Sequence, residues 1–376
     1  MTPAAQVNPA ILRGLAIEDD ASEGRISRAY RLANLRKSGI VLVSFGGLVL
    51  LAGYVAILGI ARTNLSELFA VLIEHLSFGA IPAEIDARLA QILIHLRLPR
   101  VAMALVTGGS LALSGVLMQA ITRNPLVSPY TIGVSSAAAF GASMAIMFGF
   151  GFSGLGRYFI PFSAFIFALG CAALVFSLAW FRGMGAQTMV LTGIALMYLF
   201  SALTAAIQFV ATQEQLSQVV HWTFGSFNGI GWDAVGISAA VLFIVFPLVQ
   251  GKAWALNALI SGGDEVAQSL GVNVMLLRAM STVFAVLLAA VVISFCGVIG
   301  FIGLVGPHVA RLIIGADHRW LIPFSVICGG GLLLIADTLG RLLFSPAIIP
   351  VGIVIAFVGV PIFLHLVFVR RSEYFA

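Results

Sequence analysis

Charged residues are scarce in this sequence of 376 residues. Asp, Glu, Lys and Arg make up 9% of it and hydrophobic residues 60%, whereas a soluble domain carries roughly 25% charged residues. This composition excludes an ordinary soluble domain and predicts an integral membrane protein. Alternating apolar and polar segments, the pattern of barrel strands, are absent too. Because a backbone in lipid must satisfy its own hydrogen bonds, we expect the spans to be helices of about 20 residues.

The sequence also lacks the usual patterns of disulfide-bonded, nucleotide-binding and zinc proteins. Its 3 cysteines stand alone in apolar runs, which is typical of small buried side chains. Gly251-Lys252 is not part of a Gly-x-x-x-x-Gly-Lys-Ser/Thr loop, and no His-Glu-x-x-His pair occurs. We therefore expect a chain that is not an enzyme, binds no cofactor or metal itself and contacts no nucleic acid.

Apolar runs separated by polar or Gly/Pro-rich segments predict an all-α membrane protein with about ten transmembrane helices. Its 40 glycines favour a compact bundle, because small residues let helices approach closely in lipid. The predicted spans are Ile40–Ile60, Val101–Ala120, Tyr130–Phe150, Phe159–Phe181, Met189–Val210, Ala234–Ala253, Leu277–Cys296, Phe301–Ile314, Leu321–Leu343 and Ile349–Val369.

The chain is divided into a cytoplasmic N-terminal extension, residues 1–38, and a transmembrane domain, residues 39–376. Within the extension, Ile26–Lys37 could form a basic amphipathic helix on the membrane, although a solvated tail accounts for the same charges. Lys and Arg accumulate on the cytoplasmic side of membranes. Ten spans with an inner N-terminus leave only Arg62, Arg88, Arg97, Arg100, Arg157 and Arg341 outside, among 20 Lys and Arg residues. Both termini are therefore predicted to be cytoplasmic.

Three segments stand out from the apolar background. Leu96–Ser136 joins two spans through the hinge Thr122-Arg-Asn-Pro-Leu126, Ser261–Asn273 reads SGGDEVAQSLGVN, and the glycine-rich Gly297–His308 is followed by Asp317-His-Arg319. Together they closely resemble the FecCD-type permease subunits of importers that take up ferric siderophores, haem and vitamin B12 using ATP. The resemblance covers Ile40–Val369. It implies a type II ABC importer permease fold that functions as a homodimer in the bacterial inner membrane.

The hinge is expected to bend whatever its function, because Pro125 keeps Asn124 out of helical geometry. In the family that the chain resembles, this loop and the start of the fifth span close the cytoplasmic exit. The resemblance therefore implies a cytoplasmic gate of Asn124, Leu126, Gln187 and Leu191.

The Ser261–Asn273 loop predicts a short helix near residues 263–272. Asp264 and Glu265 suit its first turn, because the helix dipole favours acids there, and Gly271 is placed to end it. Val266 and Leu270 would then share a face. The resemblance implies that this is the coupling helix, which docks on a separate ATPase subunit that binds ATP and Mg²⁺.

Arg97, Arg100 and Arg341 lie at predicted outer ends of spans, against the general charge bias. They could simply reach the lipid headgroups. The resemblance implies instead an arginine-rich rim that pairs with acidic residues of a periplasmic binding protein, for which the guanidinium fork is well suited. Asp337 and Arg341 stand four residues apart and could pair on one helix face.

The resemblance implies a machine of two permeases, either two copies of this chain or one copy and a close paralogue, with two ATPase subunits and a binding protein, surrounded by lipid. Ferric siderophore is the expected cargo, with haem or cobalamin as alternatives. An ion-coupled secondary transporter is the alternative from a different class, and Asp337 would be its coupling carboxylate. The family usually has a branched apolar residue where this chain has Gly306, so we expect a loosened turn before Pro307.

Overall fold

The computed structural model describes residues 9–58, 64–76, 86–149, 156–181, 185–343 and 347–369. Residue contacts divide the chain into two units, residues 1–46 and 47–376. Helix α1 (Pro9–Ile57) passes through this boundary. Residues 26–37 lie inside α1, which also contains the start of the first predicted span. They are therefore part of one continuous helix and not the separate amphipathic helix that the sequence suggested. The functional boundary at residue 38 stays a prediction.

The described residues contain helices, turns and loops but no β-strand. After α1 come α2 (Leu65–Leu76), α3 (Ala87–Ile92), the π-helical turn η1 (Leu93–Arg97), α4 (Leu98–Thr122), the 3₁₀ turn η2 (Pro129–Ile132), α5 (Val134–Phe148), η4 (Gly156–Tyr158), α6 (Phe159–Trp180), α7 (Ala186–Val210), α8 (Gln213–Thr223), α9 (Trp232–Gln250), α10 (Ala253–Ser269), α11 (Val274–Cys296), α12 (Ile302–Ile314), α13 (His318–Leu342) and α14 (Val351–Val369).

Each predicted span coincides with an apolar helix of the structure, and seven of these helices have the length of a membrane span. Within the described residues, seven helical segments are long and apolar enough to cross a membrane, and three shorter apolar helices lie at Val134–Phe148, Ile302–Ile314 and Val351–Leu364. These ten correspond one to one with the ten predicted spans. Of these three, α14 continues as a helix to Val369 and has 19 residues.

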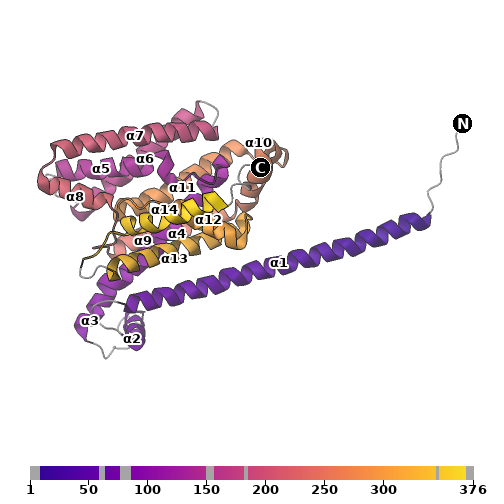
Figure 1. Ribbon diagram of the computed structural model, residues 1–376, viewed down its shortest axis with the longest axis horizontal. Coiled ribbons are helices and arrows are strands. Elements are labelled where there is room, and N and C mark those ends of the chain that lie inside the picture. Colours follow the sequence, from indigo (N-terminus) through magenta and orange to yellow (C-terminus); the bar gives the residue numbers. More distant parts are fainter. Residues whose placement is uncertain are drawn as a thin grey trace. The chain divides into compact units, whose positions relative to one another are not determined.

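Helix α4 occupies the centre of the larger unit, where it packs against α9, α11, α12 and α13 (Figure 1). Glycine makes this packing possible. A Cβ atom on Gly115 would lie 1.7 Å from the carbonyl oxygen of Gly303 in α12, and one on Gly108 would lie 2.2 Å from that of Gly329 in α13. Backbones in direct contact gain close van der Waals packing, which stabilises helix association in lipid.

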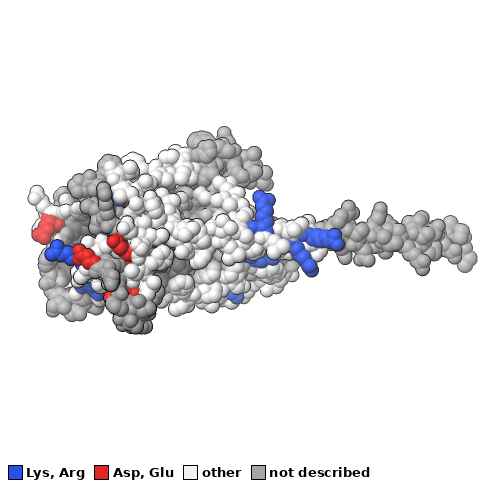
Figure 2. All heavy atoms as spheres, turned by 90° about the horizontal axis from the view of Figure 1, so that it is seen from below, with Lys and Arg blue, Asp and Glu red and all other residues white. Residues whose placement is uncertain are grey.

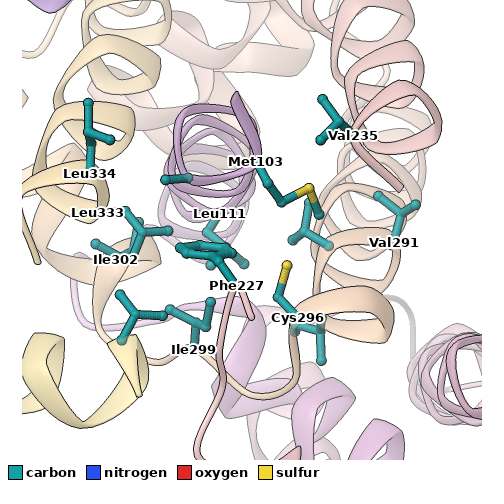
Figure 3. Close-up of a cluster of buried hydrophobic side chains, with 14 of the residues drawn as sticks. Met103, Leu111, Phe227, Val235, Val291, Cys296, Ile299, Ile302, Leu333 and Leu334 are labelled. Carbon is teal, nitrogen blue, oxygen red and sulfur yellow. The ribbon is translucent and has the colours of Figure 1, made fainter. Parts of the chain in front are cut away.

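A cluster of buried apolar side chains fills the space around α4. Phe227, from the segment between α8 and α9, is 1% exposed. Figure 3 shows its ring among Leu111 of α4, Ile302 of α12 and Ile299. One aromatic side chain from a connecting segment therefore joins helices that are far apart in sequence.

Gly306 does not loosen a turn, and that prediction is wrong. Gly306 and Pro307 both lie inside α12. A Cβ on Gly306 would stand 3.1 Å from the Cβ of Ala112 in α4 and 3.5 Å from the Cα of Gly329 in α13. The missing side chain thus lets three helices pack closely, which single-sequence reasoning could not foresee.

The surface of the larger unit is sorted by charge. In the space-filling view its middle is almost free of charged side chains, and acidic side chains gather at one end (Figure 2). That end, where α2, α3 and α8 lie in Figure 1, is called the α3 end below. The opposite end holds α10 and the hinge and is called the α10 end. An uncharged band between two polar ends is the pattern of a protein that crosses a bilayer.

Candidate functional site

The hinge at the α10 end follows directly from the end of α4. Arg123 adopts the left-handed conformation (φ +51°) and Asn124 N–H donates to the Gln119 carbonyl at 3.2 Å. The Asn124 side chain then accepts a hydrogen bond from the Leu126 N–H at 2.9 Å. The backbone therefore turns sharply before Pro125, as predicted, and leaves Leu126 46% exposed.

Gln187 and Leu191, the other two predicted gate residues, lie one turn apart in the first part of α7. Both side chains are exposed, Leu191 by 59%. In the described part of the chain no hydrogen bond connects them to Asn124 or Leu126. The structure therefore presents two exposed groups at the hinge and on α7, and their joint role as a gate stays a prediction.

The predicted coupling helix is the last part of α10. Gly263 breaks α10 with a non-helical conformation (φ 75°, ψ −167°), so that a new helical segment begins at Asp264. Gly271 ends it in the left-handed region (φ +83°), and Val272 N–H donates to the Ala267 carbonyl at 2.9 Å. This is the glycine-terminated helix end that the sequence predicts.

The same segment exposes apolar side chains. Val266 is 44% exposed and Leu270 52%, and Glu265 is exposed beside them. Asp264 is different, because its carboxylate is held by Arg278. The sequence reasoning missed two features: α10 begins already at Ala253, and Arg278 reaches the segment from α11. The signal for the second was a lone arginine inside an apolar span.

The three arginines predicted to form an outer rim lie at the α3 end, but they do not form an exposed rim. Arg97 is 8% exposed and its Nη1 donates to the Ala56 and Ile57 carbonyls at the end of α1, at 3.3 and 3.2 Å. The side chains of Arg100 and Arg341 are 12% and 15% exposed. All three guanidinium groups are turned into the bundle because backbone carbonyls and a buried carboxylate attract them.

That carboxylate belongs to Asp337 in α13, which is 3% exposed. Arg341 lies 3.6 Å from it, so the predicted i, i+4 pair is confirmed. Arg100 binds it more closely, with Nη2 2.7 Å from Oδ1 and Nε 2.9 Å from Oδ2, and its Nη1 donates to Asn228 at 2.5 Å. The sequence could not show this contact, since Arg100 and Asp337 are 237 residues apart.

Two neighbouring cavities open on the side of the bundle where α7 and α14 are exposed. The larger has a volume of about 840 Å³, and the smaller about 260 Å³. Tyr130, Thr223 and Val298 line both. The larger is mainly apolar, with Phe224, Phe301 and Phe357 in its wall. The smaller is lined by polar uncharged side chains, namely Ser135, Ser136, Ser201, Thr204 and Gln208.

The smaller cavity has an unused hydrogen-bonding group. Ser135 is 1% exposed, and its hydroxyl has no hydrogen-bond partner within the described part of the chain. Ser201 donates to Ser136 at 3.4 Å across the same wall. A buried hydroxyl without a partner costs free energy unless a ligand or water satisfies it. The cavity can therefore bind neutral hydrogen-bonding groups.

Among the residues that the structure describes, none that lines either cavity is Asp, Glu, Lys, Arg or His. Across the described residues, no group of three or more His, Cys, Asp and Glu side chains is placed to hold a metal ion. Near the α10 end, Arg278 pairs with Asp264 and Arg319 pairs with Asp317. At the start of α13, burial raises the pKa of Asp317, but hydrogen bonds from Arg319 and Asn257 outweigh it and hold this pKa at about 2.

Comparison with known proteins agrees with this architecture. Residues 45–369 match the FecCD transport family. The chain is 37% identical to the molybdate permease MolB of Haemophilus influenzae, over 86% of this chain and 94% of MolB. It is 38% identical to the hemin permease HmuU of Yersinia pestis, over 74% and 84% of the two chains. With the achromobactin permease CbrC of Dickeya dadantii the identity is 34%, over 93% and 96%.

A solved structure is similar as well. It is described as a metal-chelate type ABC transporter in an inward-facing conformation, and it superposes with a TM-score of 0.76 at 34% identity, over 88% of this chain and 99% of that one. The predicted family and fold are thereby confirmed. The chain belongs to the FecCD transport family, as a membrane-spanning permease of ABC transporters and not an enzyme.

Proposed function

We propose that this permease imports a ferric siderophore by alternating access between two permease subunits, driven by two ATPase subunits and supplied by a periplasmic binding protein. The observation that carries the choice of cargo is the pair of uncharged cavities beside α7 and α14. In the assembled importer these cavities would face the second permease, either a copy of this chain or a close paralogue, and form part of the transport pathway.

The size and lining of the cavities favour a bulky chelate over a small oxyanion. The larger cavity, at about 840 Å³, lies within the range of sites that enclose drug-sized ligands. A small oxyanion is bound through cationic side chains or converging N–H groups, and the lining residues include no cation. A chelate spreads its charge over a large organic shell, so an uncharged wall suits it better.

The lining of the smaller cavity supports the choice of siderophore over haem. The hydroxyl and amide groups of Ser136, Ser201 and Gln208 in its wall can bind the many oxygen atoms of a siderophore. Haem presents a broad apolar face and would leave most of these groups without partners, at a cost in free energy. Cobalamin carries amide groups and stays the second candidate cargo.

The remaining roles follow from the two ends of the bundle. We assign the α10 end to the cytoplasm of a bacterium, with both chain termini on that side of its inner membrane, because the predicted coupling segment, which would meet the cytoplasmic ATPase, lies at this end. Val266 and Leu270 would contact the ATPase, and Asn124, Leu126, Gln187 and Leu191 would close the exit. ATP and Mg²⁺ would bind to the ATPase alone.

Docking of the binding protein is assigned to the α3 end. Arg100 and Arg341 keep partial exposure, at 12% and 15% of their side chains, and Arg97 lies beside them. Carboxylates of a docking protein could pair with these guanidinium groups if the contacts with Asp337 loosen. Asp337 itself is unsuited to ion coupling, because two arginines already neutralise it, which argues against a secondary transporter.

The test is uptake into liposomes that contain the complete complex of permease, ATPase and binding protein. We expect ATP-dependent uptake of a ferric siderophore, with little uptake of molybdate, haem or cobalamin offered at equal concentration. Preferred uptake of molybdate would overturn the cargo assignment. Uptake by the permease alone, driven by an ion gradient, would overturn the mechanism as a whole.

A further inference from the structure

Arg278 connects the coupling segment to the end of α4. It lies in the second turn of α11 and is 8% exposed. Its Nη1 and Nη2 donate to the two carboxylate oxygens of Asp264 at 2.7 and 2.8 Å, and its Nε donates to the Ile121 carbonyl at 3.2 Å. One rigid side chain therefore binds both the first residue of the coupling segment and a residue just before the hinge.

The geometry of this contact is stiff. A guanidinium group that meets a carboxylate through two parallel hydrogen bonds fixes the orientation as well as the distance. Its third bond reaches a carbonyl in the last turn of α4, where the helix dipole favours a positive charge. Because the arginine is almost fully buried, water competes poorly for its bond to the Ile121 carbonyl, whereas the Asp264 side chain is 43% exposed and can move.

A second arginine approaches the same joint from the hinge itself. Arg123, in the left-handed conformation at the end of α4, places its Nη1 only 2.8 Å from where a Cβ on Gly263 would stand. Gly263 is the residue at which α10 breaks. The break that starts the coupling segment and the turn that starts the hinge are therefore packed directly together.

We propose that Arg278 is a positioning residue that transmits movement of the coupling segment, Asp264–Leu270, to the hinge, Thr122–Leu126. This inference rests on the proposed function, in which the ATPase moves the segment and the hinge closes the exit. When ATP binding displaces Asp264, the bidentate pair draws Arg278 with it, and the bond to Ile121 carries the displacement to the end of α4. A purely structural Arg278 would affect only the amount of folded complex.

The ratio of cargo imported to ATP hydrolysed tests the inference in liposomes that hold the complete complex. Allosteric coupling is typically worth 5–150-fold, so Arg278→Gln is expected to lower the ratio about tenfold while ATP hydrolysis continues. Arg278→Lys keeps the charge but not the fork, and an intermediate ratio is expected. Asp264→Asn keeps the bond to Ile121 and should also give an intermediate ratio, which tests the link even if Arg278→Gln fails to fold.

Arg319→Gln is the matched control. Arg319 forms an ion pair with Asp317 near the same end of the bundle, and this pair includes neither the coupling segment nor the hinge. The ratio of cargo imported to ATP hydrolysed by the Arg319→Gln complex should equal that of the unmodified complex. Unchanged ratios in Arg278→Lys and Asp264→Asn, with normal thermal melting, would overturn the inference. An unmodified complex that hydrolyses ATP but imports nothing would overturn the proposed function instead.

Discussion

Each end of the bundle contains an ion pair between an arginine and an aspartate, but the two aspartates differ in how far they are buried. At the α3 end, Asp337 is 3% exposed and joins α13 to α4 through Arg100, with Arg341 alongside. At the α10 end, the Asp264 side chain is 43% exposed, on a short segment beyond a glycine break. The Arg100–Asp337 pair fixes two long helices, α4 and α13, to each other. The Arg278–Asp264 pair holds a short segment that a docking ATPase could move.

Loss of Asp337 should have the largest effect on stability. Asp337→Ala leaves Arg100 and Arg341 close together without their carboxylate, and breaking a buried ion pair by removing one partner costs about 3–5 kcal/mol. The free energy of unfolding in detergent, measured by denaturant titration, checks this value. Asp264→Ala should cost clearly less because its carboxylate is partly hydrated already. Equal losses of unfolding free energy in Asp337→Ala and Asp264→Ala would contradict the distinction between a stabilising buried pair and a movable, partly exposed one.

The middle of α4 connects the two ends and should also tolerate little change. A Cβ in Gly115→Ala would collide with the Gly303 carbonyl, and such overpacking typically costs about 1–3 kcal/mol. Thermal melting of the purified permease measures the loss. Gly306→Ala is the matched control, since its Cβ would meet the Ala112 methyl at 3.1 Å and the Gly329 backbone at an ordinary contact distance of 3.5 Å. A control as damaging as Gly115→Ala would show that the packing at α12 is uniformly tight.

Exposed apolar residues of the coupling segment should matter for assembly and not for folding. Val266 and Leu270 are 44% and 52% exposed, so replacing both by serine should leave the melting temperature unchanged. Interface anchors commonly contribute more than about 1 kcal/mol each, so affinity for the ATPase should fall about tenfold or more. Titration of ATPase against immobilised permease measures it. Gln268→Ser, on the same segment, is the control, and an equal loss there would contradict the assignment.

The smallest expected effect is a pH dependence at the start of α13. Hydrogen bonds hold the pKa of Asp317 at about 2, below its ordinary value of 3.8. A carboxylate whose pKa is lowered by folding stabilises the protein fully at pH values above its ordinary pKa. This contribution is lost as the pH falls through the lowered pKa of the folded state. The stability difference between the unmodified protein and Asp317→Asn should therefore be present at pH 7 and shrink from pH 4 towards 2. A constant difference would show that the charge of Asp317 contributes nothing.

Local features were predictable because neighbouring residues decide them. The ten apolar segments, the bend at Asn124-Pro125 and the end of the coupling segment at Gly271 all follow from hydropathy and backbone preference. The pairing of Arg100 with Asp337 and the packing role of Gly306 were not predictable, since each depends on groups far away in the chain. Arg100 meets Asp337 across 237 residues, and Gly306 is explained only by Ala112 and Gly329.

The sequence by itself determined that this chain is a multi-pass membrane protein and which family it resembles, because scarcity of charge and short motifs are local properties. Only the tertiary structure decided which charges pair, where uncharged cavities open and that Arg278 connects the coupling segment to the hinge. Those outcomes depend on how helices pack, and glycine contacts between backbones set that packing without any pattern that a single sequence displays.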